Sequence, residues 1–360
     1  MPVVSSPRRG LGISAPARWP CPFWEGEAHT MAEIVIGVAS SHTPQLSSGV
    51  DMWEDHAERD RRNTQLLGVD AKYHTYDELL ADADPRIAAE LGRSVWEAKY
   101  GRCQDAIAAL ADRLGDARPD VAVVIGDDQR KLFKNEGIPT FAAFLGDELI
   151  DRPPAAEEAA RIPTGIRAAM WAAHSDRPER HRICTSLSQQ VVAALVAADF
   201  DIMSFSRQPD GRTLGHAFTF PRYRLGLPAG IPIAPIFVNT YYPPNVPSAR
   251  RCHALGQVIR TAVESWPSPE RVAIVASGGL SHFVVDEKLD RQVLSGLTSG
   301  NAVTLGSFSR EQLRSGTSEI LNWIVAAGAL EDKAATVVDY VPGYRTAAGT
   351  GAGMAFVYWE

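Results

Sequence analysis

The chain has 360 residues, of which 45% are hydrophobic and 22% are charged, as in an average soluble globular protein. Its 36 Lys and Arg against 43 Asp and Glu give a net charge of −7, which argues against a nucleic-acid-binding protein. No apolar run reaches the roughly 18 residues of a membrane-spanning helix. The four cysteines are widely spaced and form no CxxC pair, which predicts a reducing, cytoplasmic location. Any bound metal would need His, carboxylate or amide ligands.

The N-terminal segment differs in composition from the rest. Residues 1–30 are rich in Pro, Arg, Ser and Gly and lack the apolar stretch of a signal peptide. They are either a disordered tail or an upstream extension that precedes a true start at Met31. In both cases we expect residues 1–30 to have no role in the fold and residues 31–360 to form a single domain.

Apolar, β-branched runs alternate with helical patterns along the chain. Buried strands are predicted at residues 34–39, 121–125, 233–238, 272–276 and 354–358. Helices are predicted at residues 102–114, 187–197, 255–263 and 319–327. This alternation predicts an α/β domain with a central, mostly parallel or mixed sheet flanked by helices.

Residues 50–100 interrupt the alternation with many charges and aromatic side chains, which indicates a helical insertion between the first two strands. The insertion is either a solvated surface excursion or a lid that determines substrate specificity. Its Arg59, Arg61 and Arg62 could pair with a substrate carboxylate, but a solvated face is the favoured interpretation.

Polar segments follow four of the predicted strands, where ligands bind in sheets of this kind. They contain His42, the Asp127-Asp128-Gln129 stretch, the segment from Asn239 to Tyr241, and the turn from Gly278 to His282. A histidine after a buried strand can be held rigidly and still face a cleft, or it can simply bond a backbone carbonyl. The glycines before His282 permit close approach of the backbone to a ligand, although the turn could equally just cap a helix.

Glu319 begins a predicted helix that Thr317 or Ser318 could cap, and a carboxylate there also complements the helix dipole. Alone it is weak support for a site. Two histidines and a carboxylate together, however, indicate a non-haem iron centre of the 2-His-1-carboxylate type.

These segments, in this order, resemble the LigB-like class III extradiol ring-cleaving dioxygenases, which include the catalytic subunit of protocatechuate 4,5-dioxygenase. The resemblance covers about residues 31–360, and the Gly-Gly-Leu-Ser-His stretch that ends at His282 is its most specific part. Ile138-Pro139-Thr140-Phe141 and Tyr242-Pro243-Pro244 support it in the middle of the chain.

The resemblance implies a role for each matched residue. His42 matches the first iron-binding histidine, Glu319 matches the carboxylate ligand, and His282 matches the acid–base histidine. His216 matches a further active-site histidine that usually follows an Asp, whereas here it follows Gly215. Gln129 stands where the family has its second iron-binding histidine.

Three explanations of this replacement remain open. Gln129 or Asp128 binds the metal directly, a histidine of the insertion (His56 or His74) supplies the missing ligand, or iron is lost and the protein is not catalytic. A glutamine carbonyl can bind Fe(II), although it is a harder and weaker donor than imidazole.

The resemblance therefore implies an Fe(II)-dependent extradiol dioxygenase that opens a catechol-like or aminophenol-like ring and incorporates both atoms of O₂. The alternative is a metal-poor homologue that acts as a partner or binding subunit. A small aromatic substrate, O₂ and a homodimer are the partners that the resemblance implies. The net charge and the lack of a long apolar run predict no nucleic-acid or membrane partner.

Overall fold

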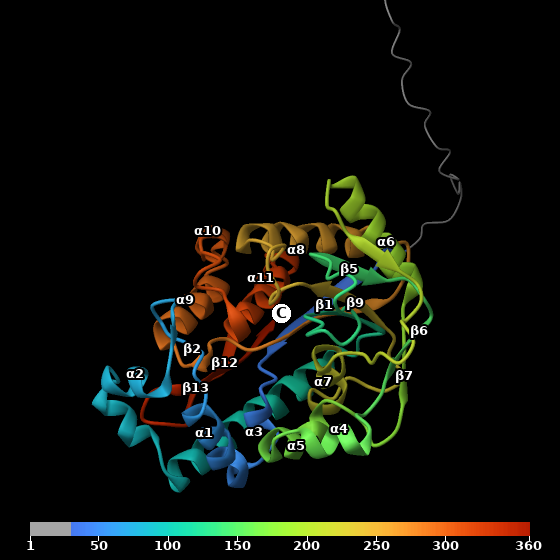
Figure 1. Cartoon of the computed structure of the whole chain (residues 1–360). Helices are drawn as coiled ribbons and strands as arrows, with labels where there is room; N and C mark the ends of the chain where they lie inside the picture. Colours follow the sequence, from blue (N-terminus) through green and yellow to red (C-terminus); the bar gives the residue numbers. More distant parts are fainter. Residues whose placement is uncertain (1–29) are drawn as a thin grey trace, which may run out of the picture.

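The computed structural model describes residues 30–360, so the predictions for the N-terminal segment lie outside the described residues, except at residue 30. Over this range the chain forms one α/β domain around a nine-stranded mixed sheet. The strand order is β11-β13-β1-β10-β4-β9-β5-β8, and β12 pairs with β13. The fold class predicted from the sequence is therefore confirmed (Figure 1).

Four neighbouring parallel strands form the centre of the sheet. They are β1 (Glu33–Ser40), β10 (Arg271–Ser277), β4 (Val121–Gly126) and β9 (Ile233–Val238). Each is almost wholly buried, because helices cover both faces of the sheet, and this explains why continuous apolar runs predicted them correctly. Their carboxyl ends lie at one edge, and the site lies at that edge.

The outer strands are mostly antiparallel or short. They are β5 (Phe141–Phe144), β8 (Met203–Phe205), β11 (His282–Val284), β12 (Ala335–Tyr344) and β13 (Thr350–Trp359). The sequence predicted only β13 among these. The strands β5, β8 and β11 have only three or four residues, which give no readable alternation. The ten-residue strand β12 was also not predicted from the sequence. Two small sheets pair β2 (Leu66–Leu67) with β3 (Tyr73–His74), and β6 (Glu148–Asp151) with β7 (Glu179–Arg182).

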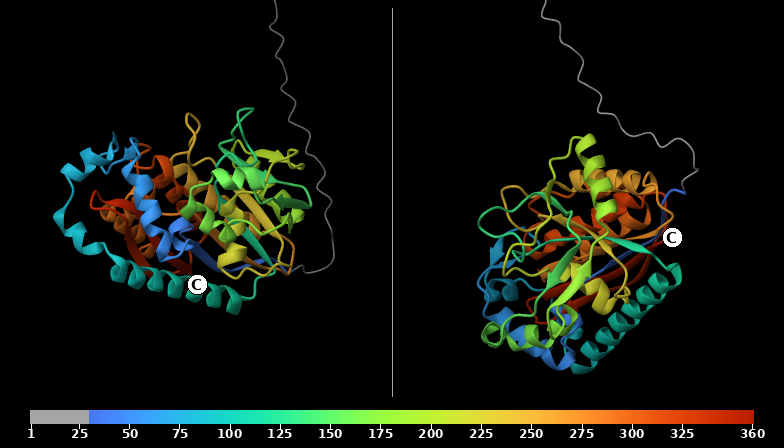
Figure 2. Two further views of the ribbon diagram at one scale, coloured as in Figure 1. Left: turned by 60° about the horizontal axis from the view of Figure 1, so that its bottom comes forward. Right: turned by 90° about the vertical axis from the view of Figure 1, so that its right-hand side faces the viewer.

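Helices cover the two faces of the sheet as separate layers, each with its own apolar core. One layer contains α6 (Thr185–Ala197), α8 (Ala249–Glu264), α9 (Glu287–Thr298), α10 (Ala302–Gly306) and α11 (Ile320–Ala329). The other contains α3 (Arg93–Ala117) and α7 (His216–Arg224). Figures 1 and 2 show α8 and α3 on opposite sides of the sheet. All four helices that the sequence predicted are present.

The helices α8 and α11 approach each other closely where two glycines meet. A Cβ on Gly256 would lie 2.0 Å from the carbonyl oxygen of Val325, and a Cβ on Gly328 would lie 2.1 Å from that of His253. Only glycine fits at either position. This close packing fixes α11, and with it the residue that immediately precedes α11, Glu319.

Residues 50–100 contain η2 (Val50–Met52), α1 (Trp53–Arg61), the β2–β3 hairpin, α2 (Tyr76–Ala81), η3 (Pro85–Glu90) and the start of α3. The hairpin packs beside β11, the strand that begins with His282. The Arg314 guanidinium stacks over the ring of Tyr73 on the same hairpin, 5.5 Å from the ring centroid. The remaining short elements are η1 (Pro44–Leu46), α4 (Ala156–Arg161), α5 (Thr164–Ala168), η4 (Met170–Ala172) and η5 (Ser315–Glu319). Within residues 30–360, no helix is long and apolar enough to cross a membrane.

Candidate metal centre

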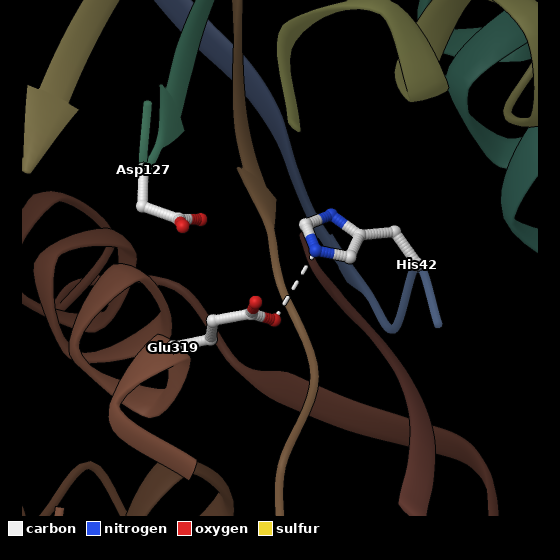
Figure 3. Close-up of side chains that lie close together, drawn as sticks. All are labelled: His42, Asp127 and Glu319. Carbon is white, nitrogen blue, oxygen red and sulfur yellow. Dashed lines mark ion pairs between the residues drawn. The ribbon is translucent and has the colours of Figure 1, made fainter. Parts of the chain in front are cut away.

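Three buried side chains converge at the carboxyl edge of the sheet. His42 follows β1, Asp127 follows β4, and Glu319 ends η5 just before α11 (Figure 3). One ligand atom from each lies within 4.8 Å of the other two. Because an ion binds His nitrogen and carboxylate oxygen at about 2.0–2.2 Å, small side-chain rotations would let all three share one divalent cation.

His42 is held by one ring nitrogen and presents the other to the site. Its Nδ1 lies 2.9 Å from Oγ of Ser277, and its Nε2 lies 3.2 Å from Oε2 of Glu319. Burial would lower the pKa of His42, but the carboxylates of Glu319 and Asp127 outweigh it and raise that pKa above its ordinary value. A ring oriented through its second nitrogen in this way is typical of metal-binding histidines.

Glu319 accepts hydrogen bonds from two directions. The backbone N–H of Gly279 donates to Oε2 at 2.7 Å, and Nε2 of Gln129 donates to Oε1 at 3.0 Å. Burial favours the neutral acid, but His42, His282 and the Gly279 N–H together hold the pKa of Glu319 well below its usual range. Glu319 is therefore a carboxylate at neutral pH.

The prediction that Thr317 or Ser318 caps the helix at Glu319 is wrong. Oγ1 of Thr317 accepts from the backbone N–H of His282 at 3.0 Å, and the Ser318 hydroxyl donates to the carbonyl of Ser315. Both hydroxyls serve the turns on either side of the site, because η5 precedes α11 without a break and leaves no extended capping position.

Asp127 was not singled out from the sequence as a site residue. Asp127 is 2% exposed, and neither carboxylate oxygen makes a hydrogen bond of good geometry within the described part of the chain, although the Gln129 amide lies close enough to lower its pKa. Burial and the charge of Glu319 raise the pKa of Asp127 to about 7. A useful signal was present, because one of two consecutive aspartates that follow an all-apolar strand must face the cleft at the strand's end.

Asp128, by contrast, stabilises its own loop. Its carboxylate accepts from the backbone N–H groups of Leu132 at 2.8 Å and Phe133 at 2.9 Å. The next two residues, Gln129 and Arg130, both have left-handed backbones, with φ of 46° and 59°. Such conformations cost roughly 1–2 kcal/mol each for residues other than glycine, so the Asp128 hydrogen bonds stabilise an unfavourable turn.

His282 and His216, the predicted acid–base residues, lie on two sides of this group. Nδ1 of His282 donates to the carbonyl of Leu280 at 2.9 Å, and its Nε2 lies 3.5 Å from Oε2 of Glu319. The ring centroid of His216, the first residue of α7, lies 4.4 Å from that of His42. Burial and the neighbouring His42 lower the pKa of His216 well below its usual value.

Two glycines leave the space that the ring of His282 occupies. A Cβ on Gly279 would lie 2.2 Å from Cε1 of that ring, and a Cβ on Gly316 would lie 2.6 Å from Cβ of His282. Close backbone approach at Gly279 and Gly316 therefore fixes the orientation of His282.

A family model described as the catalytic LigB subunit of aromatic ring-opening dioxygenase matches residues 94–355. The chain belongs to this LigB family. It is also 32% identical over 166 residues to the gallate dioxygenase of Pseudomonas putida, an alignment that covers 40% of this chain and 45% of that relative. The alignment thus spans less than half the length of that relative.

In this LigB family member, the histidines of the insertion lie in other hydrogen-bonded settings. Nε2 of His56 lies 3.1 Å from Oγ of Ser48, and Nε2 of His74 lies 2.9 Å from Oδ1 of Asp70. Neither belongs to the group of His42, Asp127 and Glu319. Of the insertion's arginines, Arg61 pairs with Glu54 and Glu58 and Arg62 pairs with Glu58, at the C-terminal end of α1.

A small cavity with aromatic walls adjoins the group of His42, Asp127 and Glu319 on the side of Asp127 and Gln129. Its lining includes Phe133, Tyr241, Tyr242 and Arg130. The Arg130 guanidinium stacks over the ring of Tyr242, 4.5 Å from the centroid, and the Tyr241 hydroxyl lies 3.2 Å from Oγ of Ser315. The space between these side chains is only about 10 Å³, room for about one water molecule, so its aromatic walls would have to move apart before a planar ring could enter.

Proposed function

We propose that this chain is an Fe(II)-dependent, extradiol-type dioxygenase that opens a catechol-like or aminophenol-like ring and incorporates both atoms of O₂. The observation that carries the proposal is the buried convergence of His42 and Glu319 with Nε2 of His282, which lies 3.5 Å from that carboxylate. Family membership supports it, because the family is that of aromatic ring-opening dioxygenases.

The donors present fit a ferrous ion. Nε2 of His42 is buried 3.2 Å from Oε2 of Glu319, which is a carboxylate. Imidazole and carboxylate are the ligand types of non-haem iron oxygenases. When bound, Fe(II) supplies the redox chemistry that activates dioxygen toward the aromatic ring.

His282 is the residue that we propose as acid and base. Its Nδ1–H is engaged by the Leu280 carbonyl, so in the neutral ring Nε2 carries the lone pair and faces the site. Nε2 can accept a proton from a substrate hydroxyl and return it later in the cycle. His216, with its lowered pKa, stays neutral and can orient the substrate through a hydrogen bond.

The relative's name suggests the first substrates to test. Gallate is a vicinal trihydroxybenzoate, and the aromatic side chains beside Asp127 are the surface that such a ring would contact once they move apart to admit it. Cys103, Cys184 and Cys252 are unpaired in the described range, which supports a reducing compartment such as the cytoplasm for this reaction.

Oxygen uptake after anaerobic loading with Fe(II) tests the proposal, with gallate, protocatechuate, catechol and 2-aminophenol as substrates. Turnover should fall by at least about 100-fold in His282→Ala while bound iron is retained, because a general acid–base group contributes about that much or more. His253→Gln on α8 is the control for loss of a histidine outside the site. Iron binding without oxygen uptake on any of the four substrates would overturn the proposed reaction, and no iron binding would favour the partner-subunit alternative.

A further inference from the structure

We propose that Asp127 supplies the third protein ligand to the metal, in place of the histidine that Gln129 replaces. The site would then hold its ion with one imidazole and two carboxylates, from His42, Asp127 and Glu319 (Figure 3). This inference rests on the proposed function, because it concerns the metal which that function requires.

The strongest support is the state of the Asp127 carboxylate. Both of its oxygens are buried and neither makes a hydrogen bond of good geometry with a described residue, although the Gln129 amide lies close enough to lower the pKa of Asp127. Burying a carboxylate is costly unless it is paired, bonded or coordinated to a metal. Nε2 of His42 points into the same space, where it lies 3.2 Å from Oε2 of Glu319 without a hydrogen bond of good geometry. A shared cation explains why a ring nitrogen and two carboxylates converge in a buried space where hydrogen bonds do not satisfy them all.

The neighbours of Asp127 in the loop are already engaged. Both oxygens of Asp128 accept backbone N–H groups at Leu132 and Phe133, so its carboxylate turns into the loop. The amide of Gln129 donates to Glu319 at 3.0 Å. Turning this amide over would place its oxygen against the Glu319 carboxylate, which is unfavourable. Gln129 is therefore a positioning residue for Glu319, and Asp127 is the group left free to coordinate.

The charge balance is consistent with this assignment. Two carboxylates neutralise a divalent ion, whereas a glutamine carbonyl in the same place would leave one positive charge uncompensated in a buried site. The set is also harder than two imidazoles and one carboxylate, so it suits Fe(II) and the still harder Mn(II).

The test compares matched alanine variants by anaerobic titration calorimetry with Fe(II) alone, which reports stoichiometry and Kd without turnover. We expect one ion per wild-type chain, with affinity weakened at least about 100-fold in Asp127→Ala and about 10-fold in Gln129→Ala, the range for residues that only orient a ligand. The double variant Asp127→Ala/Gln129→His should regain affinity, because an imidazole returns to the coordination sphere. Urea unfolding without metal checks the fold, and Asp127→Asn replaces Asp127→Ala if the alanine variant does not fold.

The outcomes separate this inference from the proposed function. If Fe(II) binding is lost in His42→Ala but kept in the Asp127 variants, or if Gln129→Ala costs more than Asp127→Ala, the metal site stands and the assignment to Asp127 is wrong. If the wild type binds no Fe(II), the proposed function and this inference both fail.

Discussion

Asp290 on α9 is a buried carboxylate that holds the turn before His282. It accepts hydrogen bonds from the backbone N–H of Ser281 at 2.8 Å, the Ser281 hydroxyl at 2.7 Å and the Tyr340 hydroxyl at 2.8 Å. Burial raises the pKa of Asp290 to about 7, although these hydrogen bonds oppose the rise. We predict that the wild-type protein loses stability as pH rises toward neutrality and that Asp290→Asn abolishes this loss.

The sign and size follow from proton linkage. The pKa of Asp290 is about 7 in the folded chain against 3.8 as the ordinary value, so between these values the folded chain binds more protons than the unfolded chain. The free energy of unfolding therefore falls as pH rises through this window and levels off above it. At about 1.4 kcal/mol per pH unit, the wild type should lose up to about 4 kcal/mol relative to the variant between about pH 4 and pH 8.

Urea unfolding followed by circular dichroism at several pH values, with chelator present, measures the difference. The wild type and Asp290→Asn should have similar free energies of unfolding near about pH 4, and Asp290→Asn should be the more stable protein near about pH 8. Asp105→Asn removes an exposed carboxylate from α3 and controls for the change in net charge. A stability difference that does not vary with pH would show that Asp290 is ionised throughout, and the reasoning would be refuted.

Three further substitutions test the packing around the site. Gly256→Ala should cost at least about 3 kcal/mol in urea unfolding, because its Cβ would lie 2.0 Å from a carbonyl oxygen of α11; unchanged stability would contradict the close helix approach. Gly316→Ala should displace His282 and reduce turnover about 10-fold or more while Fe(II) affinity changes little, and a matching loss of both would point to general damage. Arg345→Ala should lower the free energy of unfolding in urea or on heating by about 3–5 kcal/mol, because it leaves Asp60 buried without the Arg345 Nε that lies 2.8 Å from its Oδ2. A cost below about 1 kcal/mol would show that solvent reaches Asp60.

The sequence predicted the central strands because burial on both faces of the sheet leaves a continuous apolar run in each strand. It predicted the long helices because their apolar residues recur at helical spacing. It also predicted that His42, Glu319 and His282 would meet, because strand ends share one edge and the family resemblance gave their order. It could not assign the Asp127-Asp128-Gln129 stretch. A left-handed turn at Gln129 decides which of these three adjacent side chains faces the site. The pattern of apolar residues does not predict such a turn.

The cap expected from Thr317 or Ser318 failed for a related reason. A hydroxyl before a helix commonly caps it, but Thr317 instead accepts the backbone N–H of His282, a residue 35 positions away in the chain. Local capping rules contain no information about such partners. The short strands β5, β8 and β11 are likewise defined by pairing with distant strands rather than by their own few residues.

His42, Asp127, His282 and Glu319 come from segments that are far apart in the chain, and each is positioned by a different element. The binding group therefore exists only after β1, β4 and β10 have assembled in register, so it cannot form early as a local unit. An ion bound there would link these chain segments in the folded state only. At a free metal concentration 100 times Kd, it would add about 2.7 kcal/mol to the free energy of unfolding. Amide hydrogen exchange should then slow across the whole central sheet, and the protein's resistance to unfolding would depend on the cell's supply of metal.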